Sequence, residues 1–341
     1  MATITEQARR LYDDAIVIDS TAPMAPIVGL LSTPLTPDEL VAPYRDHGVT
    51  LTSFTVGVDH IVSIEQTVKL LAQNRRFVLS RPDQLLLVQS AADIRRAKAE
   101  RKLGVNFGFQ GTNGLLGDLA MVEVYRTLGV GHMLLAYNEK NLVGDGCHEL
   151  DAGGLSRFGF RLIEEMNRVG MVVDVTHTAY RTSMDAMGAS TQPVIFSHST
   201  PKAFVEHDRN ITDDQIDACA KTGGVIGLTG VGLFMDPAGK DASAAKIAAT
   251  IDYVVQRVGP RHAGIGLDCM SDTDLMARIL RAGGTKYGSG NQYPADGMIV
   301  FEGPRVLPGV TEELLKRNYP EADIRGILGE NFLRVFEQVW R

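Results

Sequence analysis

Eight short apolar segments recur along the chain, separated by longer segments in which apolar residues have helical spacing. Each short segment is a continuous apolar run, which is typical of strands buried on both faces of a parallel sheet. Eight such strands, each followed by a helix, predict an α/β fold of the (β/α)8 barrel type. The expected strands are residues 15–18, 50–55, 105–109, 133–136, 171–175, 193–197, 225–229 and 263–267.

Three of the intervening segments carry clear helix signals. Residues 158–169 have apolar residues at helical spacing, and Gly170 follows them, where a helix end favours glycine. Residues 213–221 follow Thr212, a residue type that caps helix starts. A third helix is expected at residues 244–258.

Length and composition agree with one large barrel. The chain has 341 residues, of which 44% are hydrophobic and 22% charged, and barrels of this type often exceed 250 residues. No change of composition divides the chain, so residues 1–341 are expected to form one barrel domain. The glycine-rich segment 283–297, GGTKYGSGNQYPADG, is expected to be a long loop over the barrel mouth.

Charge and cysteine content exclude several classes of function. The net charge of -7 argues against a nucleic-acid surface, which needs a basic patch. The three cysteines form no CxxC pair, which argues against a disulfide scaffold and against a structural zinc site. Without an apolar run long enough for a signal peptide or a membrane span, we expect a cytoplasmic protein with no membrane partner.

Polar side chains follow several expected strands at the point where each strand ends. His177 and His198 follow the fifth and sixth strands, and Asp268 follows the eighth. Active sites of (β/α)8 barrels lie at the carboxyl ends of the strands, so these residues are expected to meet in one pocket. Any one of them alone could be a structural polar group. Two imidazoles and a carboxylate together favour a site for zinc or a similar ion.

Other strand ends supply further candidates. Gln110 follows the third strand and is a possible completing metal ligand. Tyr137 and Asn138 follow the fourth strand and are expected to contact the substrate. The phenol of Tyr137 suits a donor to a developing oxyanion, and Tyr293 in the glycine-rich segment is a second candidate for a similar part.

Four stretches of the chain carry longer and more specific motifs. They are GLSRFGFRLIEEMNRVGMVVDVTH (154–177), PVIFSHSTPKAFVEHDRNITDD (193–214), HAGIGLDCMSD (262–272) and ELLKRNYPEADIRGILGENFLRVFEQV (313–339), the last with a G-x-N-x-x-R-V-F run. These stretches resemble the membrane (renal) dipeptidase family, peptidase family M19, a branch of the amidohydrolase-type metal-dependent hydrolases. The resemblance covers nearly the whole chain and implies a metal-dependent hydrolase that forms a homodimer.

The resemblance also implies roles for individual residues. His177 and His198 stand where the family has two histidine ligands of one metal ion. Asp268 stands where the family has an aspartate that contacts the catalytic water and the substrate amine. Arg209 stands where the family binds the substrate carboxylate, and a guanidinium fork suits a carboxylate well. A surface ion pair of Arg209 with a nearby aspartate, Asp208 or Asp213, is the alternative.

The chain departs from the family at the ligands of its second metal ion. Thr21 and Pro23 replace the histidine and aspartate of the family's H-x-D motif after the first strand. Gln110 replaces the glutamate that bridges the two ions, and a neutral amide cannot neutralise two cations. Tyr137 replaces a substrate-binding histidine. These departures predict a site for one Zn²⁺, with another divalent ion or no tightly held ion as alternatives.

The leading functional hypothesis is a mononuclear hydrolase that cleaves a C–N bond of a small carboxylate-bearing molecule but is not an ordinary dipeptidase. A zinc ion can lower the pKa of water to about 7, so one ion is chemically sufficient. A lyase or isomerase on the same site and a non-catalytic ligand-binding barrel are the alternatives. Asp268 is expected to stay charged at neutral pH and act as the general base, or else to be a metal ligand.

Overall fold

Parallel strands form a closed ring in the computed structural model, which describes residues 4–22, 35–274, 277–278, 292–294 and 299–340. Eight strands pair in the order β2-β1-β9-β8-β7-β6-β5-β4, and a pairing between β2 and β4 closes the ring. The predicted (β/α)8 barrel is therefore confirmed. The strands of the ring are β1 (Ile18–Ala22), β2 (Leu51–Val58), β4 (Leu103–Gln110), β5 (Val130–Leu134), β6 (Val172–Asp174), β7 (Val194–Ser199), β8 (Ile226–Leu228) and β9 (Ala263–Ile265).

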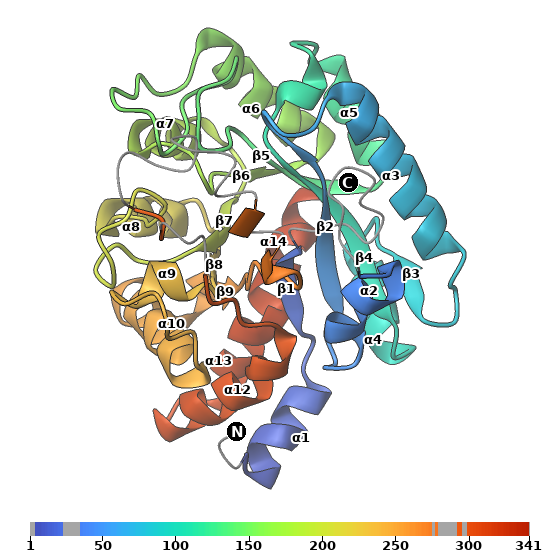
Figure 1. Cartoon of the computed structure of the whole chain (residues 1–341), viewed down its shortest axis with the longest axis vertical. Helices are drawn as coiled ribbons and strands as arrows, with labels where there is room; N and C mark the ends of the chain where they lie inside the picture. The colour runs from blue at the N-terminus through green and yellow to red at the C-terminus, as the bar shows by residue number, and fades with distance from the viewer. Residues whose placement is uncertain (1–3, 23–34, 275–276, 279–291, 295–298, 341) are drawn as a thin grey trace.

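Helices surround the ring and cover its outer face (Figure 1). The larger apolar core lies between helices and strands, where for example the ring of Phe109 on β4 meets the ring of Tyr125 on α5 at 4.6 Å. The helices are α1 (Glu6–Asp14), α2 (Pro37–Arg45), α3 (Ile64–Leu79), α4 (Ala91–Ala99), α5 (Ala120–Thr127), α6 (Arg157–Val169), α7 (Tyr180–Ala189), α8 (Asp213–Lys221), α9 (Gly232–Met235), α10 (Ala244–Val258), α12 (Leu307–Lys316), α13 (Glu321–Arg325) and α14 (Asn331–Val339).

The elements expected from the sequence agree with this architecture. Each of the eight apolar segments overlaps one strand of the ring, and α8 and α10 have the expected bounds. Helix α6 ends at Gly170, whose φ of 82° is the left-handed conformation that glycine adopts without strain. Strand β3 (Leu85–Leu87) was not expected, and it pairs with the first residues of β4 outside the ring.

Helix α14 closes the end of the barrel at which the strands begin. Its Phe332 and the following Trp340 pack in one apolar cluster with the first residues of the strands, such as Ile18. Glycines make room for these rings, because a Cβ atom at Gly264 would lie 2.5 Å from the Phe332 ring. The indole of Trp340 also donates a hydrogen bond of 2.9 Å to the carbonyl of Gly131. The polar side chains that follow the strands lie at the opposite end of the barrel, where the strands finish.

Some expectations from the sequence concern residues that the structure describes only in part or not at all. Of the expected loop 283–297, only residues 292–294 are described, and Pro23 also lies outside the described residues. Within the described ranges, no helix is long and apolar enough to cross a membrane.

Candidate active site

Two histidines meet at the carboxyl ends of neighbouring strands. His177 follows β6, and His198 lies within the last residues of β7. Their Nε2 atoms are 3.0 Å apart, and both side chains are buried. The structure thus brings together the two residues that the sequence selects as metal ligands.

The hydrogen bonds behind His177 fix which ring nitrogen carries the proton. Its Nδ1 lies 2.6 Å from the amide oxygen of Asn138, which can only accept a hydrogen bond. The thiol of Cys147 points to the same oxygen, at 3.6 Å. Nδ1 of His177 therefore carries the hydrogen, and Nε2 presents a lone pair.

The ring of His198 is also oriented from behind, by a hydroxyl group that donates to a carboxylate. The Ser197 hydroxyl donates to Oδ2 of Asp174, so this hydroxyl accepts the hydrogen bond from Nδ1 of His198 at 2.8 Å. Asp174 is itself held by the backbone amide and the hydroxyl of Thr176, at 3.0 and 2.7 Å. His198 therefore also presents the lone pair of Nε2. A carboxylate behind the ring of a ligating histidine is a common support of metal sites.

The chemistry of this donor pair fits a cation. Burial, and then the positive charge of Arg209, keep the pKa values of His177 and His198 well below the usual value, so both rings are neutral, the form that binds a metal. Two lone pairs directed at each other across 3.0 Å repel unless a cation or proton lies between them. Among the described residues, no third His, Cys, Asp or Glu completes a metal-binding cluster with the two imidazoles.

Three residues of this region have an uncommon backbone conformation. Asn138, His177 and Asp268 have φ values of 59°, 62° and 56°, the left-handed region in which residues other than glycine are rare. They lie within four residues of the ends of β5, β6 and β9, respectively. Such conformations cost about 1–3 kcal/mol each and concentrate at functional sites.

Arg209 is the positive charge of the site. Only 3% of its surface is exposed, and its Nη2 donates to the carbonyl of His198 at 3.3 Å. The guanidinium carbon lies 5.2 Å from the ring of Phe234. The alternative of a surface ion pair is wrong, because Arg209 is buried, Asp208 contacts His148, and Asp213 pairs with Arg257.

Asp268 is a buried carboxyl group. Burial raises its pKa to about 7, although the charge of Arg209 acts in the opposite direction. The expectation of a low pKa assumed a cation beside the carboxylate. From the protein groups alone, Asp268 titrates near neutrality, which suits a residue that transfers protons.

Comparison with known proteins decides the family. A model of the membrane dipeptidase family, peptidase family M19, matches residues 44–279 and 279–341. The chain belongs to this family. The resemblance found in the sequence is thereby confirmed.

The curated relatives are dipeptidases that are longer than this chain. Dipeptidase verJ of Clonostachys rogersoniana is 30% identical over 259 residues, which are 75% of this chain and 61% of verJ. An uncharacterised dipeptidase of Schizosaccharomyces pombe is 28% identical over 288 residues, 81% of this chain and 62% of its own length. This M19 chain thus spans about six-tenths of the length of these relatives.

Solved structures of similar proteins cover the whole fold. An amidohydrolase from Pseudomonas aeruginosa is 33% identical, with a TM-score of 0.85 over 98% of this chain and 99% of its own. A metallopeptidase from Rhodobacter sphaeroides with a phosphinate mimic of the dipeptide L-Ala-D-Ala superposes over 96% of this chain and 100% of its own, with a TM-score of 0.72. At 19% identity, the second supports the barrel fold alone.

Thr21 and Gln110, which the sequence resemblance places at ligand positions of a second metal ion, make other contacts in this M19 chain. The hydroxyl of Thr21 lies 3.3 Å from Nδ1 of His198, behind the ring and away from the Nε2 pair. The buried side chain of Gln110, at the end of β4, donates to the hydroxyl of Thr55 at 3.3 Å. Neither residue supplies a charge that would hold a second cation.

Tyr137, which the sequence places in the position of a substrate-binding histidine, covers the face of His177. The two rings are stacked, with centroids 4.2 Å apart and planes at 30°. Tyr137 is only half-buried, so one part of its ring stays accessible beside the histidine pair. Contact of Tyr137 with a substrate stays a prediction.

A group of aromatic side chains beside Arg209 was found only in the structure. His148 Nε2 lies 3.4 Å from the hydroxyl of Tyr293, and Nδ1 lies 3.4 Å from Asp208. The ring of His207 is 5.2 Å from that of Tyr293. Burial, and then the charge of Arg209, lower the pKa of His207 to about 4. Both histidines lie in irregular segments, so no strand-end pattern marks them in the sequence.

Asp19 is a second buried carboxyl group near the site. Its Oδ1 accepts a hydrogen bond of 2.8 Å from the amide of Leu267, whereas Oδ2 has no hydrogen-bond partner within the described part of the chain. Burial raises its pKa to about 7, and the negative charge of Asp268 acts in the same direction. The sequence shows Asp19 at the end of the first strand, but it does not predict that burial and the charge of Asp268 raise the pKa of this residue.

Proposed function

We propose that this protein is a metal-dependent hydrolase with one catalytic zinc ion, which cleaves a C–N bond of a small molecule with a carboxylate. The observation that carries the proposal is the pair of Nε2 atoms of His177 and His198, 3.0 Å apart with both lone pairs directed at each other. Family membership supports the reaction class, because the relatives are named dipeptidases and an amidohydrolase.

His177 and His198 would hold the ion, with the amide oxygen of Gln110 as a further ligand. When bound, zinc supplies a Lewis acid that polarises the scissile carbonyl and makes water more acidic. Asn138 and the Ser197–Asp174 pair orient the two imidazoles from behind. Few protein ligands leave open positions, as catalytic zinc sites require.

Arg209 would bind the substrate carboxylate. Its guanidinium is buried, and among the described residues no carboxylate pairs with it, so its charge is available to an anion. A buried guanidinium fork binds a carboxylate through two charge-assisted hydrogen bonds. Tyr293 and Asn138 belong to the same region and are proposed to contact the substrate.

Asp268 and Tyr137 would carry the proton transfers. With a pKa near 7, a fraction of Asp268 is ionised at neutral pH and accepts a proton from the attacking water. The same carboxyl group can return this proton to the leaving nitrogen. The phenol of Tyr137 donates a hydrogen bond to the oxyanion that develops on the substrate carbonyl.

Ordinary dipeptides are not the proposed substrates. Thr21 and Gln110 make hydrogen bonds to His198 and Thr55 in this chain, where the family resemblance implies ligands of a second ion. Without that ion, the arrangement that serves dipeptide cleavage is incomplete. A substrate with a more reactive amide or imide-like C–N bond is therefore favoured.

Metal analysis combined with product analysis tests the proposal. Protein purified without chelator should contain one equivalent of zinc, and a chelator should abolish turnover of carboxylate-bearing amides. Products should be heavier than the substrate by one water in total. Protein without metal and without turnover would instead indicate a ligand-binding barrel.

One observation favours a second candidate, a lyase or isomerase. A carboxyl group with a pKa near 7, such as Asp268, also suits proton transfer at carbon next to a carbonyl group. Mass spectrometry separates the two reactions, because an isomerase adds no water. Incorporation of ¹⁸O from labelled water into the product would support the hydrolase.

A cytoplasmic location is also a proposal. It is supported by the three cysteines, Cys147, Cys219 and Cys269, all of which are unpaired, as expected in a reducing compartment. Cell fractionation with an antibody against the chain tests it. Recovery in a secreted fraction would contradict the location without affecting the proposed reaction.

A further inference from the structure

Asp59 is a buried carboxylate that the proposed reaction does not use. It directly follows β2, and 2% of its surface is exposed. Its Oδ1 accepts a hydrogen bond of 2.8 Å from the backbone amide of Asn113, and its Oδ2 accepts one of 2.6 Å from Nδ2 of Asn141. Burial raises the pKa of Asp59, and these two hydrogen bonds act in the opposite direction. Burying a carboxylate is costly unless hydrogen bonds compensate, so Asp59 binds both segments firmly.

The first of these contacts shapes the turn that follows Gln110. Gln110 is the last residue of β4, and its carbonyl accepts a hydrogen bond of 3.0 Å from the backbone amide of Asp59. Gly111 comes next, with a φ of 130°, and a Cβ atom there would collide with the carboxyl carbon of Asp59. The carboxylate thus fills the space that a side chain at residue 111 would need, and residues 110–113 wrap around it.

The second contact fixes the loop that follows β5. Nδ2 of Asn141 also lies 2.8 Å from the carbonyl oxygen of Leu135 and 2.9 Å from the hydroxyl of Thr112. Its Oδ1 accepts hydrogen bonds of 2.8 and 3.2 Å from the backbone amides of Val143 and Gly144. One side chain therefore ties this loop to the end of β5, to the turn after β4 and to Asp59.

The same loop carries Asn138, the residue that orients His177. Asn138 lies three residues before Asn141, and its amide oxygen accepts the hydrogen bond of 2.6 Å from Nδ1 of His177. Its φ of 59° is costly for a residue other than glycine, so surrounding contacts must hold it. On the other side of the loop, the amide of His148 donates to the Asn138 carbonyl at 2.8 Å. Without the Asn141 contacts, Asn138 loses the support on one of its two sides.

We propose that Asp59 is a positioning residue of the active site, which acts through Asn141 on Asn138 and thereby on His177, and which also holds Gln110. Strands β2, β4 and β5 are neighbours in the ring, so a carboxylate at the end of β2 can bind the segments that follow the other two. The inference rests on the proposed function in one respect, since zinc is the ion that these side chains would hold.

An amide in place of the carboxylate breaks the contact without changing its size. Asp59→Asn leaves one oxygen for two donors, the Asn113 amide and Nδ2 of Asn141, and turns an NH₂ group toward one of them. Residues that orient ligand histidines from behind typically contribute 10- to 100-fold to metal affinity. The zinc dissociation constant of Asp59→Asn, measured by chelator competition, should therefore rise by at least about 10-fold.

A swap of the two residues separates their contact from a general loss of stability. Asn141→Asp places two carboxylates opposite each other and should also raise the zinc dissociation constant by about 10-fold or more. The double variant Asp59→Asn/Asn141→Asp restores a donor and an acceptor, in the reversed direction. It should bind zinc at least about threefold more tightly than either single variant. A double variant weaker than both single variants would show independent structural damage and would overturn the proposal.

The metal-free protein offers a readout that does not depend on zinc. The Nδ1 hydrogens of His177 and His198 are both buried and hydrogen-bonded, so both should give imidazole resonances in ¹H–¹⁵N NMR that exchange slowly with water. Asp59→Asn should speed the exchange of the His177 hydrogen by about 10-fold or more. The His198 hydrogen is held by Ser197 and should exchange at its original rate. Equal acceleration of both would indicate general loosening and contradict the proposal.

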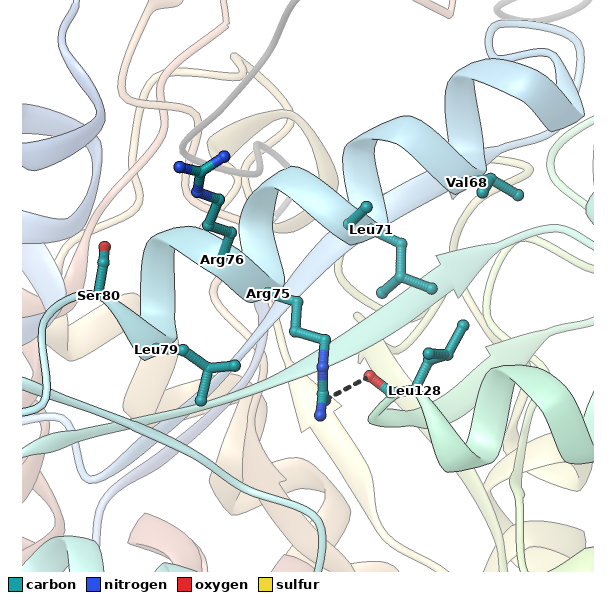
Figure 2. Close-up of a pocket in the computed structure, with 8 residues that line it drawn as sticks. Val68, Leu71, Arg75, Arg76, Leu79, Ser80 and Leu128 are labelled. Carbon is teal, nitrogen blue, oxygen red and sulfur yellow. Dashed lines mark hydrogen bonds between the residues drawn. The ribbon is translucent and has the colours of Figure 1, made fainter.

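Arg75 provides a control on the same two segments. Helix α3 follows Asp59 in the chain, and α5 follows Asn113. Near the far ends of these helices, Arg75 reaches across an apolar groove of about 670 Å³ and donates to the Leu128 carbonyl at 3.2 Å (Figure 2). Arg75→Gln removes this hydrogen bond away from the strand ends. It should change neither the zinc dissociation constant nor the exchange of the His177 hydrogen by more than about twofold.

The two measurements distinguish this inference from the proposed function. An original chain that binds no zinc would contradict the proposed function, and hydrogen exchange would still decide the role of Asp59. An unchanged zinc dissociation constant together with unchanged exchange in Asp59→Asn would overturn the role of Asp59 alone. Asn141→Ser is a second variant for the same contact, because a serine hydroxyl is too short to reach the carboxylate, and it should have the same effects.

Discussion

The hydroxyl of Thr21 lies 3.3 Å from Nδ1 of His198, on the side of the imidazole opposite the nitrogen that faces His177. A histidine at position 21 would be needed to hold a second cation, according to the family resemblance. In this chain, residue 21 instead contacts the ring of His198, the proposed metal ligand, at Nδ1. The hydroxyl helps to orient the ring and cannot reach an ion held by Nε2.

Simple L,L-dipeptides should accordingly be poor substrates. We expect their kcat/KM to be lower by about 100-fold or more than that of the preferred substrate, because only one ion polarises the carbonyl. A panel of dipeptides assayed with zinc in excess checks this. Robust, chelator-sensitive dipeptide turnover, or two metal ions about 3.5 Å apart in a crystal structure, would contradict it.

Replacing either ligand histidine should remove the metal. His177→Ala and His198→Ala should each lower the zinc content by an order of magnitude or more, because one imidazole cannot hold the ion alone. His148→Ala is the matched control, since this histidine contacts Asp208 and Tyr293 and not the Nε2 pair. Full zinc occupancy in the double variant His177→Ala/His198→Ala would refute the assignment.

Asp268→Asn separates the two roles considered for this residue. If Asp268 is the general base, the variant should keep its zinc and lose about 100-fold or more in kcat. A base must be ionised to accept the proton, so activity of the original chain should fall as the pH drops through the pKa of Asp268, which burial raises to about 7 and which the charge of a bound zinc ion would lower again. Loss of zinc in step with activity would instead identify Asp268 as a ligand.

Arg209→Met should weaken recognition of the carboxylate. We expect kcat/KM for a carboxylate-bearing substrate to fall by about 30-fold or more, because a buried charge-assisted pair is lost. The same substrate capped as an amide should react at nearly the same rate with both proteins. Equal losses for the two substrates would show that Arg209 acts mainly on structure.

Asp19 makes the stability of the fold depend on pH. Its pKa is about 7 in the folded protein, against an ordinary value of 3.8, so the folded state binds a proton that the unfolded state releases. The free energy of unfolding should therefore fall as the pH rises from about 4 to about 7, by an amount on the order of 4 kcal/mol at most.

The variant Asp19→Asn removes this titration while keeping an oxygen that can accept from Leu267. Its free energy of unfolding should change less than that of the original chain between pH 5 and pH 8, when measured by urea denaturation. An unchanged difference between the two pH values would show that Asp19 stays ionised in the folded protein.

The strands of the barrel could be predicted from sequence because each is buried on both faces and is therefore a continuous apolar run. Strand β3 escaped because Leu85–Leu87 consists of leucine, which is also a strong helix former, and because it pairs outside the ring. The three Leu residues have no flanking pattern that separates them from a helix segment. Short, partly paired strands depend on their neighbours more than on their own residues.

The histidine pair could be predicted because strand ends converge in every barrel of this type. The pKa of Asp268 could not, since it depends on burial and on Arg209, which lies 59 positions away in the sequence. His148, His207 and Tyr293 come together from irregular segments. Their proximity depends on the conformations of these segments, which the spacing of apolar residues does not predict.

Helix α14 follows the nine described strands in the chain. The apolar end of the barrel, at which the strands begin, therefore stays uncovered during synthesis until this helix leaves the ribosome. A nascent chain that has already formed its ring of strands would expose Ile18 and its neighbours to water and to chaperones. Phe332 and Trp340 can cover these strand ends only after the strands themselves have been synthesised.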